Sequence, residues 1–336
     1  MIIKNNQFTN KILIITSLCI YSVFSFAQET AITEVALPSE IKSINALLSS
    51  EEIVWMATGQ GMYSYNGQEF TRYYNPQQAE IYCINAMIAD KAGNKWWGTY
   101  NGMLVKFGKS GILKTLDIKS FCKTDNYLIT SISINLETNI ENQDILLTTS
   151  GGEIFVYNAI TGAVKNVESP SDATIYSIKY GYSSTIWLCT SDGFYTRNSS
   201  SKWKKKSDIY TAYGLFENDG KYWAIGRDKD KKAVLMLYYN EDSEEKNGKF
   251  IWKDFDLHQL KNVYTRLYEV DFTSDEIVWI AAESGLIRYN PLNASIQEYI
   301  KDNIKETFTI QHIAVQDDKL LWMSTPGKKL FRVDLK

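Results

Sequence analysis

The sequence is poor in the residues that carry out most enzyme chemistry. It contains two histidines, His258 and His312, and four cysteines in 336 residues. It has no H-E-x-x-H, G-x-S-x-G, P-loop or C-x-x-C motif. His312 lies in an alternating apolar segment and His258 in a connecting segment, where a hydrogen-bonded or solvated histidine is the ordinary case. The sequence therefore predicts no catalytic residue, no metal site and no cofactor.

Only one long apolar run is present, and it lies at the amino terminus. Lys4 and Lys11 precede the apolar run at residues 12–24. The run is followed by Ser-Phe-Ala, which has the small residues of a cleavage site. This predicts a signal peptide over residues 1–27 and an exported mature chain over 28–336, in the periplasm or secreted. An uncleaved anchor is the alternative, but the run is shorter than the ~20 residues of a membrane-spanning helix. No transmembrane segment is expected in the mature chain.

An excess of positive charge is also lacking. The chain has 36 basic and 39 acidic residues, a net charge of −3, and 36 − 2 = 34 basic residues remain without Lys4 and Lys11. Nucleic-acid binding needs a basic surface, so no nucleic-acid partner is predicted. Cys83, Cys122 and Cys189 remain in the mature chain, an odd number, so at least one thiol is expected to be unpaired.

What the sequence has in abundance is one repeated pattern. An apolar-x-Trp segment is followed by a glycine six residues after the tryptophan, and then by a segment of alternating polarity. Four copies keep the pattern, with the pairs Trp55 and Gly61, Trp96 and Gly102, Trp187 and Gly193, and Trp279 and Gly285. Weaker copies are anchored at Leu146, Trp223 and Trp322. The chain therefore contains seven repeats.

The repeats predict an all-β fold, a seven-bladed β-propeller with four-stranded blades. Strand-like segments lie before and after the tryptophan strand, for example residues 83–88 and 68–73, and helical periodicity is scarce. Repeats of this kind with a period in the forties are typical of propellers. A blade is apolar on both faces, so each tryptophan is expected to fill the space between neighbouring blades. Each glycine is expected to supply a positive φ in the following turn.

The two ends of the chain are predicted to meet. The seventh repeat ends after three strands, and a strand-like segment, residues 30–36, precedes the first repeat. We expect residues 30–36 to form the outer strand of the last blade and so close the ring. The lysine-rich residues 202–206 are expected on an outer edge, where charge opposes strand-to-strand aggregation.

The repeat as it stands in residues 90–104, with Trp96 and Gly102, resembles the two-component regulator propeller repeat. The resemblance covers about residues 30–336 and is strong in four blades. That family forms the extracytoplasmic sensor part of hybrid histidine kinases, so the resemblance implies a sensor-like propeller. The kinase, transmembrane helix, β-sandwich module and second propeller of such regulators have no counterpart in this sequence. The chain is therefore expected to need an envelope protein partner.

Aromatic residues recur at or just before the start of the predicted inner strands. Because inner strands all begin at one mouth of a propeller channel, these rings are expected to form a collar that suits a glycan or a peptide. Packing between blades is the alternative. The collar residues are Tyr82, Tyr127, Tyr176, Tyr210, Tyr264 and Phe308. Turns that open on the same face add Tyr100, Arg227 and Asp228 as candidate ligand-binding residues, with plain solvated loop tips as the alternative.

Two main classes of function remain open. The first is a non-catalytic binding protein outside the cytoplasm that recognises a glycan fragment, a peptide or a protein partner. The second is a propeller enzyme, a lyase or hydrolase that uses carboxylates and tyrosines in the channel, since this fold supports both roles. Carboxylates that converge in the channel with shifted pKa values would favour the enzyme. A scaffold for envelope proteins is a third possibility.

Overall fold

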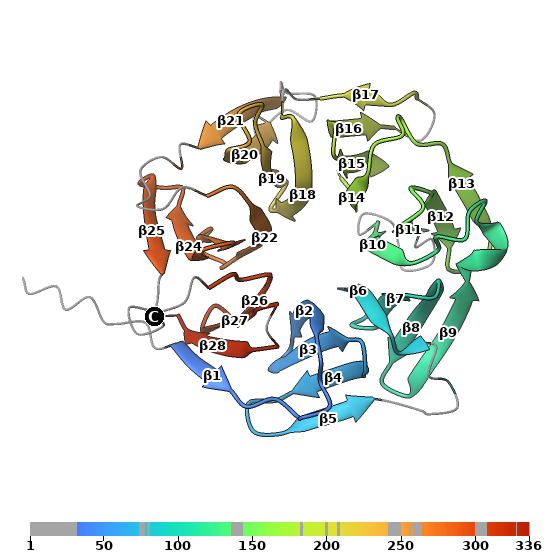
Figure 1. The fold of residues 1–336 in the computed structure, drawn as a ribbon, viewed down its shortest axis with the longest axis horizontal. Coiled ribbons are helices and arrows are strands. Elements are labelled where there is room, and N and C mark those ends of the chain that lie inside the picture. Colours follow the sequence, from blue (N-terminus) through green and yellow to red (C-terminus); the bar gives the residue numbers. More distant parts are fainter. Residues whose placement is uncertain are drawn as a thin grey trace, which may run out of the picture.

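The protein is a closed ring of seven antiparallel sheets with four strands each (Figure 1). The computed structural model describes residues 32–73, 78, 81–135, 144–181, 184–198, 201–206, 209–240, 250–255, 257, 264–299, 308–326 and 328–335. The ring confirms the predicted all-β, seven-bladed propeller. The predicted signal peptide and His258 lie outside the described residues.

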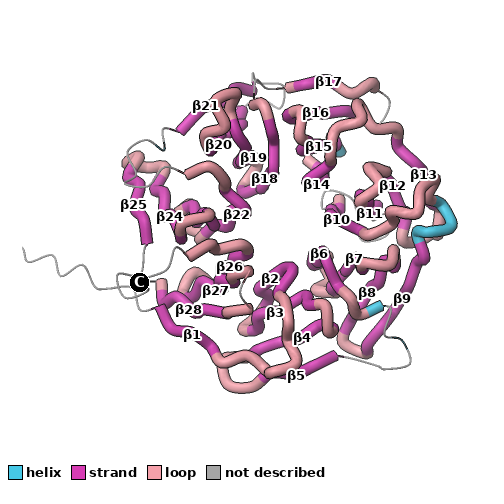
Figure 2. The backbone as a smooth tube through the Cα atoms, in the orientation of Figure 1, coloured by secondary structure: helices cyan, strands magenta, loops and turns pink. Residues whose placement is uncertain are grey.

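The sheets are numbered here in chain order from the first complete one. The strands of the first three sheets are β2 (Ile44–Ser50), β3 (Ile53–Thr58), β4 (Gly61–Tyr65) and β5 (Phe70–Tyr73); β6 (Ile84–Ala89), β7 (Lys95–Thr99), β8 (Met103–Gly108) and β9 (Gly111–Asp117); and β10 (Ile129–Ile134), β11 (Asp144–Thr149), β12 (Ile154–Asn158) and β13 (Val164–Val167). A short 3-10 helix, η2 (Ile118–Phe121), joins the second sheet to the third, and Figure 2 shows strands and loops making up almost all of the ring.

The remaining sheets follow the same order. Their strands are β14 (Ile175–Tyr180), β15 (Ile186–Thr190), β16 (Gly193–Arg197) and β17 (Lys204–Lys205); β18 (Thr211–Asn218), β19 (Lys221–Arg227), β20 (Ala233–Asn240) and β21 (Phe250–Phe255); β22 (Leu267–Phe272), β23 (Val278–Ala282), β24 (Gly285–Asn290) and β25 (Ser295–Tyr299); and β26 (His312–Gln316), β27 (Leu320–Ser324) and β28 (Leu330–Asp334). The seventh sheet takes its fourth strand from the other end of the chain.

That fourth strand is β1 (Ile32–Val35), which pairs antiparallel with β28. Ile32 lies opposite Val333, and Val35 lies opposite Leu330. Figure 1 shows the blue strand β1 beside the red strand β28. The predicted closure of the ring by residues 30–36 is therefore confirmed.

The hydrophobic core is divided into seven layers, one between each pair of neighbouring sheets. Each layer combines side chains of two sheets and contains one repeat anchor, on the second strand of its sheet. The anchors are Trp55, Trp96, Leu146, Trp187, Trp223, Trp279 and Trp322, and all of them are buried. The predicted role of the tryptophans, filling the space between blades, is confirmed.

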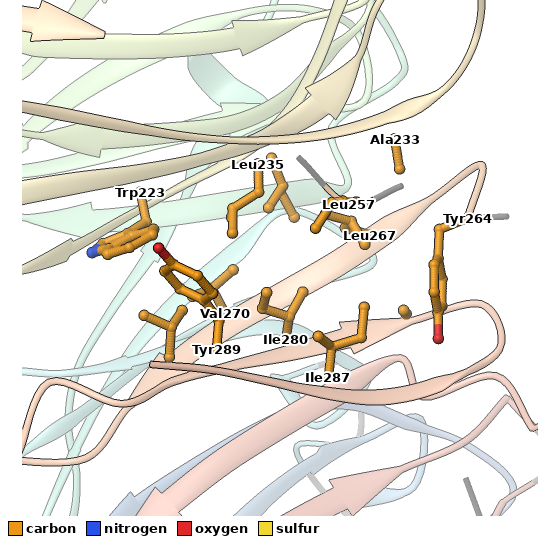
Figure 3. Close-up of a cluster of buried hydrophobic side chains, with 13 residues drawn as sticks. Trp223, Ala233, Leu235, Leu257, Tyr264, Leu267, Val270, Ile280, Ile287 and Tyr289 are labelled. Atoms are coloured by element: carbon orange, nitrogen blue, oxygen red, sulfur yellow. The ribbon is translucent and has the colours of Figure 1, made fainter. Parts of the chain in front are cut away.

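The layer between the fifth and sixth sheets shows how these contacts are arranged. Trp223 lies at one end of it, with ring centroids 5.2 Å from Phe255 and 6.0 Å from Tyr289. Tyr264 stands at the other end, and leucine and isoleucine side chains fill the middle (Figure 3). Burying one such side chain is worth about 1.5–3 kcal/mol, so each layer contributes far more than a single sheet could gain alone.

Two of the tryptophans are also held by a polar side chain six positions earlier. Trp96 Nε1 donates to Asp90 Oδ2 at 3.2 Å, and Trp322 Nε1 donates to Gln316 Oε1 at 2.6 Å. The other oxygen of Asp90 accepts the backbone N–H of Asn94 at 2.9 Å, which shapes the turn before the tryptophan strand. These residues therefore fix both the turn and the ring orientation.

The glycine of the repeat is required by the backbone. Gly193 has a φ of 105°, and a Cβ there would lie 2.7 Å from the carbonyl oxygen of Ile209. Only glycine adopts this conformation without strain. The other glycines of the repeat that have positive φ are Gly61, Gly102, Gly152 and Gly285.

Two further expectations concern the outer surface and the thiols. Lys204 and Lys205 form the exposed outer strand β17, as predicted. Cys83, Cys122 and Cys189 are all free, with Cys189 buried and the other two half-buried. Within the described ranges, the chain forms no helix with the length and apolarity needed to cross a bilayer.

Candidate functional site

The first strand of every sheet lies next to the ring axis. These inner strands are β2, β6, β10, β14, β18, β22 and β26, and each contacts its two neighbours (Figure 1). Because the sheets are equivalent repeats, the inner strands all begin on one face of the ring. This face, called the start face below, also holds the turns between second and third strands.

Six of the inner strands have an irregular register near their start. One residue of each strand has no partner on the neighbouring strand and forms a bulge. Such bulges re-aim a side chain. The bulged residues are Asn45, Asn85, Thr130, Tyr176, Tyr213 and Tyr268. The first three sheets thus place polar side chains at this position, and the next three place tyrosines there.

The polar bulge residues tie the inner strands together. Asn45 Nδ2 donates to the carbonyl oxygen of Ile84 at 2.7 Å, and Asn85 Nδ2 donates to that of Ile129 at 3.0 Å. Each asparagine therefore bonds the edge of the next inner strand. These side chains stabilise the ring, because an inner strand has an edge that no sheet partner covers.

The tyrosine bulge residues gather with two arginines into what is called here the start-face cluster. The Cζ atom of Arg266 lies 4.8 Å from the ring centroid of Tyr213 and 4.9 Å from that of Tyr268. Arg227 Cζ lies 5.7 Å from the Tyr213 ring, and the Tyr176 ring meets Tyr213 edge-on at 5.2 Å. The cluster therefore joins the fourth, fifth and sixth sheets.

The cluster is positively charged. Neither Arg227 nor Arg266 forms an ion pair with any residue that the structure describes. Arg227 instead donates from Nε to the carbonyl oxygen of Thr265, and the buried Nε of Arg266 has no hydrogen-bond partner in the described part of the chain. Burial raises the pKa of Tyr213, although the two guanidinium groups oppose that shift. Two arginine side chains that form no described ion pair and lie beside tyrosine rings favour the binding of an anionic ligand.

Three of the predicted site residues lie in or beside this cluster. Tyr176 and Arg227 belong to it, and the exposed Tyr210 precedes β18 and donates its backbone N–H to the carbonyl oxygen of Arg227. The start-face cluster is therefore defined as Tyr176, Tyr210, Tyr213, Arg227, Arg266 and Tyr268. Asp228 shapes the next turn, since its Oδ1 accepts two backbone N–H groups. Tyr100 is exposed but belongs to the second sheet, across the ring from the fifth (Figure 1).

The other four predicted collar residues pack between sheets. Tyr82 lies 6.3 Å from Trp97 between ring centroids, and Phe308 meets Phe331 edge-on at 4.7 Å. Tyr264 is buried in the layer of Figure 3. Tyr127 is half-buried against the layer between the second and third sheets. The collar therefore does not continue around the ring as exposed aromatic surface, and a ligand-binding role for these four residues stays a prediction.

The sequence analysis missed Tyr213, Arg266 and Tyr268. A signal was present, because Tyr176, Tyr213 and Tyr268 each lie ten or eleven residues before the tryptophan of their repeat. Choosing them would have required knowing that this position is the bulge. Arg266 has no counterpart in the pattern, so only the contacts between sheets identify it.

Charged side chains also lie further along the axis, on β22 and β26. Glu269 Oε2 accepts the backbone N–H of Ile313 at 2.9 Å, and Asp271 Oδ2 accepts that of Val315 at 2.6 Å. His312 Nδ1 lies 3.4 Å from the same oxygen of Glu269. The two carboxylates therefore cap the free edge of β26.

The electrostatics of this axial group depart from those of a solvated surface. Burial raises the pKa of Asp271 to about 6, although the N–H groups of Val315 and Phe272 oppose the shift. Burial lowers the pKa of Lys179 on β14, and Glu217 and Asp271 oppose it. Carboxylates that lie close together near the axis, with a raised pKa at Asp271, are the arrangement that was expected to favour an enzyme. Edge capping accounts for the same residues without catalysis.

The described residues contain no group of three or more histidine, cysteine, aspartate or glutamate side chains that could hold a metal ion. The start-face cluster consists of tyrosine and arginine and lacks the carboxylate, imidazole and thiolate groups that commonly bind metals in proteins. The cluster is instead suited to a flat or anionic organic group.

Comparison with known proteins identifies the fold of the chain and does not identify its function. No protein-family model matches the chain, and no curated protein matches it. Among solved structures, streptogramin B lyase has a TM-score of 0.70 at 17% identity, over 92% of this chain and 99% of that one. Virginiamycin B lyase from Staphylococcus aureus, in a catalytically inactive histidine-to-alanine form with quinupristin, has a TM-score of 0.69 at 17% identity, over 92% and 100% of the two chains.

A third similar structure is the extracellular domain of a protein described as a hybrid two component system from B. thetaiotaomicron. Its TM-score is 0.67 at 15% identity, over 90% of this chain but 41% of that one. At these identities the similarity shows the fold alone, a propeller shared by lyases and by the extracellular domain of a two component system. The resemblance to the regulator repeat is therefore supported at the level of the fold.

Asp271→Asn tests the effect of the enclosed axial charge on stability. The folded pKa of Asp271, about 6, lies above the ordinary 3.8, so between these values the folded protein binds more protons than the unfolded chain. The contribution of Asp271 to stability is thus complete below about pH 4 and is lost as the pH rises through about 6. We expect the denaturation midpoint of the wild type to fall more between these pH values than that of Asp271→Asn.

Asparagine keeps an oxygen that can accept the N–H of Val315, so the variant changes the charge and retains the acceptor. The exposed Asp172 provides the matched control, and Asp172→Asn should follow the wild-type profile. Parallel profiles for the wild type and Asp271→Asn in urea denaturation would show that the axial charge has no such effect.

Proposed function

We propose that the protein is an exported, non-catalytic binding protein that holds a small ligand against the start-face cluster. The observation that supports this most is the contact of two arginines, neither in a described ion pair, with the rings of Tyr213 and Tyr268, and the contact of Tyr213 with Tyr176 of a third sheet. Such a cluster offers flat apolar area, hydroxyl groups and positive charge at one place. The bound ligand would be a glycan fragment or a peptide.

The cluster is both accessible and rigidly supported. Tyr176 is 36% exposed and Tyr210 is 63% exposed, so a ligand can reach their rings. Tyr213 and Tyr268 lie at bulges of their strands, and both side chains pack against core layers. A site on strands keeps its geometry better than a site on loops, which favours binding without rearrangement.

Export and a partner protein belong to the same proposal. The sequence pattern of residues 1–27 supports export, and protein recovered outside the cytoplasm should then begin at Gln28. A sensor-like propeller can report binding only through another protein, and we propose a partner in the cell envelope. The shared fold with an extracellular domain of a two component system supports this idea.

Calorimetric titration with neutral oligosaccharides, acidic oligosaccharides and short peptides tests ligand binding. We expect at least one class to bind, and we expect both Tyr176→Ala and Tyr210→Ala to weaken it about tenfold, because losing one stacked ring costs roughly 1.4 kcal/mol. Both side chains are exposed enough for the variants to fold.

Leu292→Ala provides the control, since Leu292 is 82% exposed and lies beyond β24 on the outer part of the sixth sheet. If the affinities of the tyrosine variants equal that of the control, the binding site lies elsewhere. Absence of binding by all three classes would overturn the proposal for a small ligand.

A lyase is the second candidate, and the axial group is the observation that favours it. His312 and Glu269 lie 3.4 Å apart, close enough to share a proton, and Asp271 is two residues further along β22. The similar lyase is inactive when a histidine is replaced by alanine. A histidine–carboxylate pair is a common acid–base arrangement.

Incubation with quinupristin, followed by chromatography, distinguishes the two candidates. The binding proposal predicts that quinupristin is recovered unchanged. Conversion that is lost in His312→Ala and retained in Leu292→Ala would establish the lyase instead.

A further inference from the structure

The guanidinium group of Arg266 lies over two tyrosine rings. The rings of Tyr213 and Tyr268 lie at nearly equal distances from its Cζ atom, 4.8 and 4.9 Å. A contact between a cation and a ring face leaves the N–H edge of a planar guanidinium available for hydrogen bonds. That edge matches the two oxygens of a carboxylate and binds them with two parallel hydrogen bonds.

Three acidic side chains beside Arg266, Arg227 or their chain neighbours already have other partners. Glu283 accepts the hydroxyl of Thr265 at 2.7 Å, and Glu269 accepts a backbone N–H on β26. Asp228, next to Arg227, accepts the N–H groups of its own turn. No described carboxylate forms an ion pair with either guanidinium group, so the carboxylate of a ligand would supply the first such contact.

The inner strands offer little to an extended peptide. A peptide that added to an inner strand would need the free N–H and C=O groups of its edge. Side chains of neighbouring sheets already bond to many of these groups, including the N–H groups of Ile178, Tyr180, Ile313 and Val315 and the carbonyl groups of Ile84 and Ile129. The surface that remains available to a ligand is formed by the tyrosine side chains, and such a surface binds the flat face of a ring.

We infer that the ligand is a saccharide that carries a carboxylate, such as an oligosaccharide of uronic acids. The carboxylate lies in the plane of the Arg266 guanidinium, with Arg227 beside it. The sugar ring lies against the exposed rings of Tyr176 and Tyr210. This inference rests on the proposed function and adds the chemical class of its ligand.

Titration with trigalacturonate and with its methyl ester tests the inference, because the ester keeps the rings and removes the charge. We expect the acid to bind at least about tenfold more tightly than the ester, and its affinity to fall as salt is raised. Arg266→Gln should bring the two affinities to within about threefold of each other. The glutamine keeps polar N–H groups but has no charge.

Arg197→Gln is the matched control. Arg197 also lies over an aromatic ring, with its Cζ 5.5 Å from the centroid of Trp203, but on the outer part of the fourth sheet. This variant should keep the wild-type preference for the acid. Should Arg266→Gln fold poorly, as judged by circular dichroism, Arg227→Gln takes its place and should reduce the same preference at least about threefold.

The outcomes separate the ligand class from the binding function. Equal binding of the acid and the ester would overturn the carboxylate and leave a binding protein for neutral sugars. A preference for the acid that survives both arginine variants would place the carboxylate away from these arginines and overturn the inference. Preferential binding of a tripeptide through its terminal carboxylate would overturn the saccharide. Absence of any binding would overturn the proposed function itself.

Discussion

The structure depends on one constraint: a four-stranded sheet that is apolar on both faces cannot be stable unless another sheet covers each face. The protein meets this constraint with seven sheets and seven core layers, each with one anchor such as Trp223 or Trp322. A row of sheets would leave two faces exposed, so the chain closes into a ring through β1 and β28. Stability is therefore shared around the ring and does not reside in any single blade.

Closure also creates the place where function is proposed. It brings seven inner strands around one axis and leaves each with an uncovered edge. Asn45, Asn85, Glu269 and Asp271 use their side chains to bond such edges. The start-face cluster arises from the same geometry, because tyrosines at bulges of neighbouring strands bring Tyr176 against Tyr213, and Tyr213 and Tyr268 against Arg266. The ring thus both requires polar residues at its axis and gathers them.

The sequence predicted the fold well because the constraint acts within each repeat. The tryptophan and the glycine six residues later fix a strand, a turn and the next strand locally, and the short strand before the first repeat revealed the closure. The candidate site was predicted only in part. Tyr264 and Tyr213 both lie near the start of an inner strand, yet the first packs between sheets and the second is turned by a bulge. A shift of one residue reverses the direction of a side chain on a strand. Arg266 and Tyr213 belong to two neighbouring sheets, so no pattern within one repeat predicts their contact.

The most direct test of this account compares chains that begin at residue 32 and at residue 37, because only the first retains β1. Urea denaturation followed by tryptophan fluorescence measures the difference. The account predicts that loss of β1 lowers the free energy of unfolding by about 2–4 kcal/mol or prevents folding, because Ile32 and Val35 pack into the layers on both sides of the seventh sheet. Equal stability of the two chains would contradict it, since the ring would then need no closing strand.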